Sequence, residues 1–156
     1  MMKDPNEAIS VLNGLIETCR DSQEGFRKAA EAVKSEDLKE LFRSYMRQRA
    51  EFVTELQIEV KRLRGSAENT GSLAGAIHRG WADLKKAVAG DDDAAIIAEV
   101  ERGEDSMVRS YQDALSKSLS DEARSDVDRQ LRKIKEAHDK IRALKTSRKV
   151  EKEVRR

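Results

Sequence analysis

The 156-residue sequence contains few of the residues that build disulfide frameworks, metal clusters or sheets. It has one cysteine, one proline and two histidines, and aromatic residues make up 4% of it. A single cysteine excludes an internal disulfide and fits a reducing compartment. No apolar run approaches the roughly 18 residues that a transmembrane helix needs, and the first ten residues lack the pattern of a secretory signal peptide. We therefore expect a cytoplasmic protein without a membrane segment.

Charged residues are abundant, and the apolar residues are regularly spaced. Charged residues make up 39% of the chain and apolar residues 38%. The apolar residues recur every three or four positions, which is the spacing of amphipathic helices, and the length corresponds to about one domain. The sequence therefore predicts an all-α protein, with one helical bundle over residues 1–145 and a charged C-terminal extension over residues 146–156.

Start signals delimit four long helices in this pattern. Pro5 stands at the first position of the first helix, Ser35 caps the second, Asp92 and its two aspartate neighbours cap the third, and Ser120 precedes the fourth. The connection between the first and second helices is short, and so is the one between the third and fourth. Each of these pairs is therefore expected to be antiparallel.

The second and third helices are separated by a long connection that contains a shorter helix from about Ser72 to Ala89. In a ferritin-like crossover bundle, such a connection runs along the bundle and makes the second and third helices parallel. In an up-and-down bundle these helices are antiparallel, and the short helix packs on one side. We favour the crossover because this connection is long enough to span much of the bundle, whereas the other two connections are short. The short helix also has one narrow apolar seam, which suits a helix lying across a bundle. The seam consists of Leu73, Ile77, Trp81 or Gly80, Leu84 and Val88.

One polar or reactive side chain interrupts the apolar face of each long helix. These residues are Cys19, Arg49, Glu104 and His138, and their distances from the short connections place all four near the middle of the bundle. Because a buried ion without a partner is costly, Arg49 and Glu104 should pair, with His138 hydrogen-bonded to one of them. Such a layer can fix the register of the helices, or it can bind a ligand or act in catalysis. A third alternative is that the layer is not buried in this way.

The sequence does not contain the ligands of a di-iron centre. That centre needs a glutamate from each of two helices and a Glu-x-x-His motif from each of the other two. Neither histidine belongs to such a motif, since Lys135 and Gly75 stand three residues before them. Glu17 and Glu51 point away from the predicted core, and Arg49 takes the space of the cations. The same guanidinium disfavours a single metal on the rest of the layer, so we predict no metal, no cofactor and no catalytic residue.

Charge is distributed unevenly along the chain. Residues 129–156 contain 12 Lys or Arg and 4 Asp or Glu, whereas residues 1–128 contain 19 and 26. The end of the chain is therefore a basic segment on an acidic body. A solvated helix end explains this pattern, and self-association through opposite charges is an alternative. Nucleic-acid binding is unlikely because no aromatic side chains accompany the cations for base stacking.

Five blocks of sequence resemble a bacterial family of ferritin-like four-helix bundles of unknown function. The blocks are ETCRDSQEGFR at 17–27, RQRAEFVTELQ at 47–57, GSLAGAIHRGWADLK at 71–85, ERGEDSMVRSYQDAL at 101–115 and KEAHDKIRAL at 135–144. The resemblance covers about residues 6–145 and implies a ferritin-like bundle without an assigned activity. The wider ferritin-like group suggests iron storage, di-iron oxidation or DNA protection during stress.

Taken together, these observations predict a ferritin-like bundle without a complete di-iron site. We expect a small binding or interaction protein rather than an enzyme, with a role in stress implied by the resemblance alone. A protein partner or self-association would then be its mode of action, as a monomer or a small homo-oligomer. The alternative is a metal-binding ferritin-like oxidase or storage protein.

Overall fold

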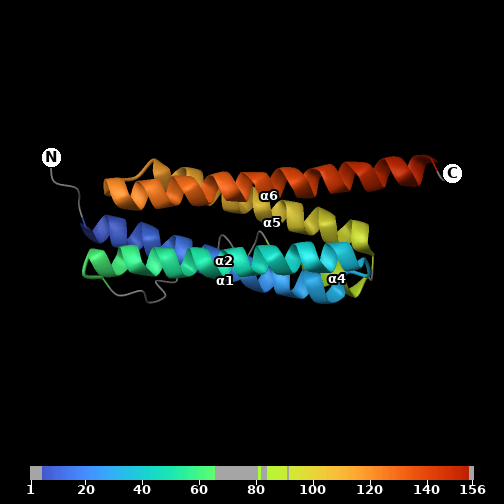
Figure 1. The fold of residues 1–156 in the computed structure, drawn as a ribbon, viewed down its shortest axis with the longest axis horizontal. Helices are drawn as coiled ribbons and strands as arrows, with labels where there is room; N and C mark the ends of the chain where they lie inside the picture. Colours follow the sequence, from blue (N-terminus) through green and yellow to red (C-terminus); the bar gives the residue numbers. More distant parts are fainter. Residues whose placement is uncertain (1–4, 66–80, 82–83, 91, 155–156) are drawn as a thin grey trace.

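The computed structural model describes residues 5–65, 81, 84–90 and 92–154. The described residues form four long helices and one short helix, arranged as an elongated bundle (Figure 1). The helices are α1 (Pro5–Ala32), α2 (Glu36–Arg62), α4 (Leu84–Ala89), α5 (Asp93–Leu115) and α6 (Asp121–Val154). The predicted all-α class, a four-helix bundle with an extra short helix, is confirmed.

Helices α2 and α5 begin at the same end of the bundle. The backbone N–H groups of Lys34 and Ser35, in the turn before α2, donate to the carboxylate of Asp93 at 2.8 Å and 3.1 Å. Asp93 is the first residue of α5. Helices α2 and α5 therefore run parallel, and α5 begins at the opposite end of the bundle from the end of α2 (Figure 1). This arrangement is the predicted crossover, and it excludes the up-and-down alternative.

Side-chain caps start the helices as the sequence predicts. Ser35 accepts from the backbone N–H of Leu38 at 3.3 Å, and Asp92 accepts from that of Ala94 at 3.0 Å. Helix α6 continues without a break into the charged C-terminal extension and ends at Val154. Lysine, arginine and glutamate are good helix formers, so a charged sequence can extend a helix that packing has already nucleated.

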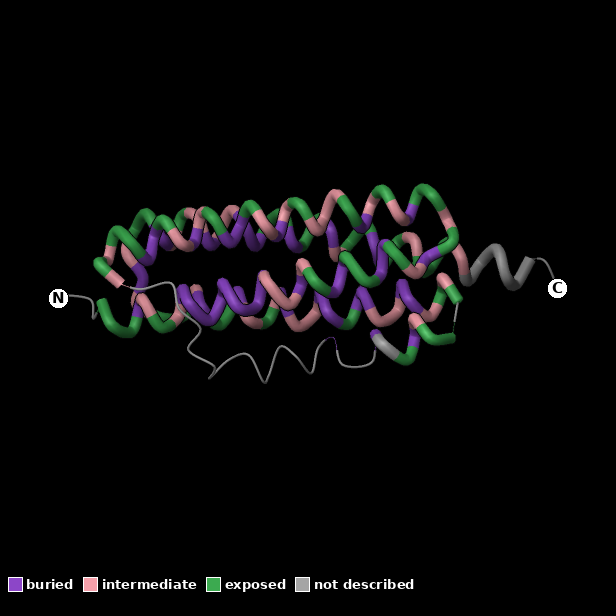
Figure 2. The backbone as a smooth tube through the Cα atoms, turned by 90° about the horizontal axis from the view of Figure 1, so that it is seen from below, coloured by how far each residue is buried: buried purple, intermediate pink, exposed green. Residues whose placement is uncertain are grey.

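The buried faces of the long helices point toward a common core (Figure 2). One cluster of core residues fills the half where α1 begins, and a second fills the half where α1 joins α2. The second cluster includes Leu84 of α4, which is 3% exposed, and Trp81, which is 9% exposed. Val88 packs against this cluster and is partly buried. Leu73, Ile77 and most of the predicted short helix lie outside the described residues.

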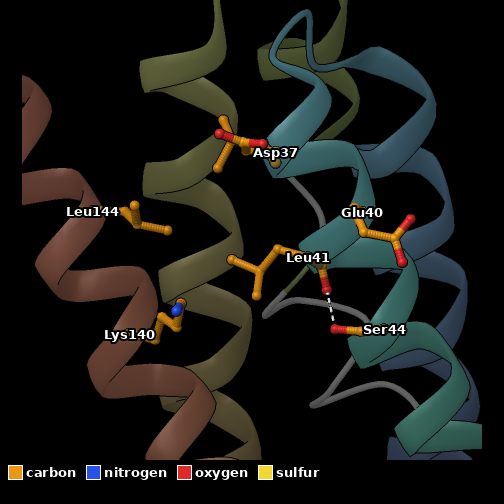
Figure 3. A pocket seen from close by; sticks show the side chains of 7 residues that line it. Asp37, Glu40, Leu41, Ser44, Lys140 and Leu144 are labelled. Carbon is orange, nitrogen blue, oxygen red and sulfur yellow. Dashed lines mark hydrogen bonds between the residues drawn. The ribbon is translucent and has the colours of Figure 1, made fainter.

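The bundle has a groove between α2 and α6. These two helices pack against each other less extensively than α1 and α2 or α5 and α6 do. The groove has a volume of about 430 Å³, and Leu41 and Leu144 extend into it from opposite sides (Figure 3). Among the described helices, none is both long and apolar enough to cross a membrane.

Candidate functional site

The polar side chains of α2 and α5 form a fully buried ion pair. Arg49 donates from Nη1 and Nη2 to the two carboxylate oxygens of Glu104, at 2.6 Å and 2.7 Å. Both side chains are 0% exposed. Two parallel hydrogen bonds between a guanidinium and a carboxylate give a strong and directional contact. The structure therefore places the two charged members of the predicted layer against each other.

Further contacts stabilise the charge of Arg49. Its Nη1 also donates to Ser22 Oγ at 3.0 Å. The guanidinium carbon lies 5.2 Å and 5.9 Å from the ring centroids of Phe26 and Phe52, where cation–π attraction operates. Burial by itself lowers the pKa of Arg49, but the charge and hydrogen bonds of Glu104 outweigh it, so the pKa lies above its ordinary value. Arg49 therefore stays charged inside the core.

Cys19 is fully buried and takes part in a second polar cluster. Its Sγ lies 3.0 Å from the hydroxyl of Tyr111, which donates its own proton to Gln130 Oε1 at 2.7 Å. Since that hydroxyl has a single proton to donate, the thiol donates to the tyrosine oxygen. Burial raises the pKa of the Cys19 thiol to about 11 and raises the pKa of Tyr111 well above its ordinary value. At neutral pH the thiol is therefore protonated and a poor nucleophile.

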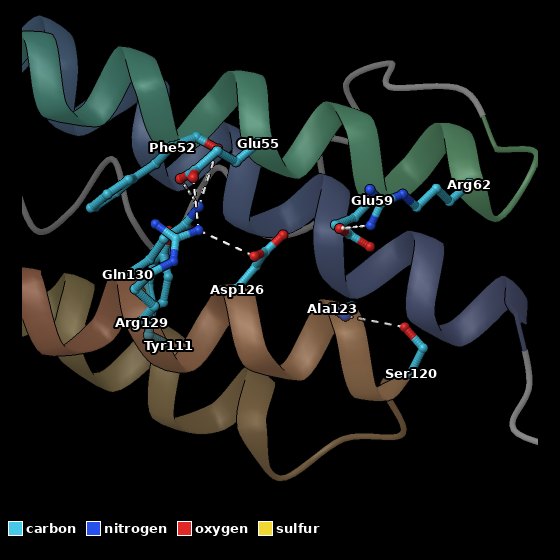
Figure 4. Close-up of polar contacts among 10 residues, drawn as sticks. All are labelled: Phe52, Glu55, Glu59, Arg62, Tyr111, Ser120, Ala123, Asp126, Arg129 and Gln130. Atoms are coloured by element: carbon cyan, nitrogen blue, oxygen red, sulfur yellow. Dashed lines mark hydrogen bonds and ion pairs between the residues drawn. The ribbon is translucent and has the colours of Figure 1, made fainter.

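The hydrogen bonds of this cluster continue from the core to the surface between α2 and α6 (Figure 4). Gln130 Nε2 donates to the backbone oxygen of Phe52 at 3.4 Å and to Glu55 Oε1 at 3.0 Å. Arg129 donates to the other carboxylate oxygen of Glu55 at 2.7 Å. Gln130 is 0% exposed, so these bonds satisfy polar groups that would otherwise be costly to bury.

His138 does not join the layer, which corrects the sequence prediction. Its Nε2 lies 2.6 Å from Asp105 Oδ1, on the outer side of α5, and its side chain is 13% exposed. The reason is the position of the buried face of α6. Ala137, which is 2% exposed, takes the inward position between Ile134 and Ile141, and this rotates the next residue by about 100° toward the surface.

Glu17 also differs from the sequence prediction. It was expected to point away from the core, but it is 9% exposed and pairs with Arg20 at 3.3 Å. All residues from Leu12 to Cys19 are buried, so this part of α1 is covered on every side. A helical wheel assumes one buried face and cannot reveal such a stretch. Glu51, in contrast, is exposed as predicted.

The buried residues do not fit a metal centre. Among the described residues, no group of three or more His, Cys, Asp or Glu side chains is arranged to hold a metal ion. Both carboxylate oxygens of Glu104 are occupied by Arg49, whose positive charge would repel a cation. Cys19 is engaged with Tyr111, and His138 is turned toward Asp105. A ferritin-type di-iron or single-metal site would require these contacts to be replaced.

Sequence reasoning missed three polar residues that complete these clusters. The sequence analysis singled out none of Ser22, Tyr111 and Gln130. Gln130 had a detectable signal, because it lies three residues after Val127 and four before Ile134, both of which belong to the buried face of α6. Tyr111 also gave a signal, because the hydroxyl of a buried tyrosine usually needs a hydrogen-bond partner.

A comparison with protein families identifies the relationship of this chain. A family model described as a domain of unknown function (DUF2383) matches residues 7–117, from the first turn of α1 to the turn after α5. The chain belongs to this family. The DUF2383 match contains four of the five blocks named above, and the block at 135–144, in α6, lies outside it. No curated protein matches the chain.

Proposed function

We propose that this DUF2383 protein is a cytoplasmic interaction protein of the ferritin-like type that associates with a second copy of itself. The observation that carries this proposal is the groove between α2 and α6. The buried ion pair then has a structural role, because its two-pronged geometry fixes the register of α2 against α5. No step of this function requires a metal or a cofactor.

The groove has an apolar floor and charged edges (Figure 3). Leu38, Leu41 and Leu144 supply the apolar surface, and Leu41 and Leu144 are only partly buried within this chain. Asp37 and Glu40 on α2 are exposed. Glu40 pairs with Arg47 at 3.4 Å, so Asp37 is the main source of negative charge on that edge. An apolar surface with an acidic edge suits a basic helix, because the helix can cover the leucines while its cations approach the carboxylates.

The same chain contains a helix with that charge. Helix α6 extends past the other helices at the end where α1 joins α2 (Figure 1), and its residues Lys140 and Leu144 line the groove just before this extension. Residues 145–156 contain six Lys or Arg and two Glu. In a two-fold dimer, each copy would place this end of α6 in the groove of its partner, so that both contacts form at once. A second copy therefore has the chemistry that the groove requires.

The first prediction concerns the oligomeric state. The full chain should sediment as a dimer at micromolar concentration in low salt and should shift toward monomer as salt rises, because screening weakens contacts between exposed charges. Removing residues 145–156 should give a folded monomer at all salt concentrations. Analytical ultracentrifugation, with circular dichroism to verify the fold, measures both effects.

A pair of charge reversals serves as the matched control for this prediction. Lys140→Glu changes the α6 edge of the groove, whereas Lys117→Glu makes the same change at an exposed position in the turn after α5. Because it removes a cation from the groove and adds a carboxylate that attracts the basic end of the partner's α6, only the first variant should strengthen association. A chain that is monomeric in low salt, or that associates equally well after the truncation, would contradict the proposed dimer.

The second prediction tests the alternative of a metal-dependent oxidase or storage protein. Purified protein should contain well under one equivalent of iron or manganese per chain after mild dialysis, because Arg49 neutralises the only fully buried carboxylate of the layer. Elemental analysis by mass spectrometry measures this content. Stoichiometric metal that survives dialysis would replace the interaction proposal with the metal-dependent one.

A further inference from the structure

The ring of Trp81 occupies a narrow slot between two helices. The slot is walled by Gly25 of α1 and Gly103 of α5. A Cβ atom at either glycine would lie 2.4 Å from a carbon of the indole ring, which is far inside van der Waals contact. The backbones of the two helices therefore leave room for one flat ring between them, and only glycine at both positions permits it.

A third side of the slot is aromatic. Phe26 meets the indole edge-on, with ring centroids 5.4 Å apart and planes at 68°. Edge-to-face contact of this kind favours a planar aromatic ring over an aliphatic side chain. The same Phe26 ring lies 5.2 Å from the guanidinium carbon of Arg49. The slot thus adjoins the buried ion pair through a single side chain.

The fit of Trp81 in this slot is incomplete. Trp81 is only 9% exposed, and its Nε1 is buried without a hydrogen-bond partner among the described residues. An unpaired buried donor destabilises the docked ring. Each glycine also weakens its helix relative to alanine. A contact selected for stability alone would avoid both costs by packing an alkyl side chain between two alanines, and stability is commonly sacrificed at binding sites.

We propose that the slot between Gly25 and Gly103 is a binding site for a planar, neutral aromatic ring of about indole size, and that Trp81 fills it as an internal ligand which such a molecule displaces. A ring without an N–H group fits the slot better than indole does, because it leaves no donor unpaired. This site is separate from the α2–α6 groove and does not depend on the proposed dimer.

The 156-residue chain allows a direct test because Trp81 is its only tryptophan. Indene is the probe, since it has the shape of indole but lacks the N–H group. Titration with indene should shift the Trp81 emission to longer wavelength in a saturable way, as the ring moves from the slot into water. Emission that stays unchanged up to the solubility limit of indene would overturn the proposal, whether or not any variant folds.

Two variants locate the probe. Trp81→Ala empties the slot, so it should bind indene at least about tenfold more tightly than the parent, in which the indole competes for the site. Indene should also raise its melting temperature. The double variant Trp81→Ala/Gly103→Ala fills part of the slot with a methyl group and should lose this binding and the melting shift. Equal binding by the single and double variants would show that indene binds elsewhere and would overturn the proposed site.

Discussion

Replacement of Glu104 by alanine should destabilise the protein by about 3–5 kcal/mol, which is a large part of the stability of a domain of this size. The cause is the arginine that remains. Arg49 is 0% exposed and donates two hydrogen bonds to Glu104, so the variant buries a positive charge without its counter-ion. Urea unfolding followed by circular dichroism gives the change in the free energy of unfolding.

A double variant separates the ion pair from simple loss of volume. Arg49→Met combined with Glu104→Leu removes both charges while keeping apolar volume, and it should recover much of the stability lost in Glu104→Ala. Glu31→Ala on α1 is the control, because its ion pair with Arg27 at 2.7 Å is exposed to solvent and such pairs contribute about 0–1 kcal/mol. If Glu104→Ala unfolds at the same urea concentration as the parent, the result contradicts a stabilising buried ion pair between Arg49 and Glu104.

Shortening the connection between α2 and α5 should abolish the soluble monomeric fold. Helix α2 has 27 residues and is therefore about 40 Å long, and α5 begins beside Ser35, the N-cap of α2. The chain must return over this distance after α2 ends. Four Gly/Ser residues in place of residues 66–90 span at most about 14 Å, so the variant cannot place α5 parallel to α2. Loss of a cooperative thermal transition, together with aggregation in gel filtration, is the expected result.

A second replacement separates the length of the connection from the contacts that its side chains make with the core. A Gly/Ser segment of the same length as residues 66–90 can span the bundle but removes Trp81, Leu84 and Ala87 from the core. We expect this variant to fold with reduced stability, since the long helices keep their own contacts while part of one core cluster is exposed. A cooperatively melting monomer with the four-residue linker would contradict the crossover.

The sequence by itself determined the helices and their order. Apolar spacing and capping residues are local features, so Pro5, Ser35 and Asp92 could be assigned to helix starts without knowledge of the neighbours. The long connection between the second and third helices favoured the crossover, which the structure confirms. The pairing of Arg49 with Glu104 also followed from the sequence. Their opposite charges lie on apolar helix faces at similar height in the bundle, and burying either charge without the other would cost several kcal/mol.

Only the tertiary structure decided which side chains lie together across helices. The wheel could not choose between Ala137 and His138 for the inward position, since neighbouring residues differ by about 100° and the rotation of α6 is set by packing. The burial of Glu17 depends on elements that cover α1 from several sides. The slot around Trp81 requires Gly25 and Gly103, which are 78 residues apart in the chain, to face each other across one ring. Such complementarity arises from close packing between helices, which no local pattern specifies.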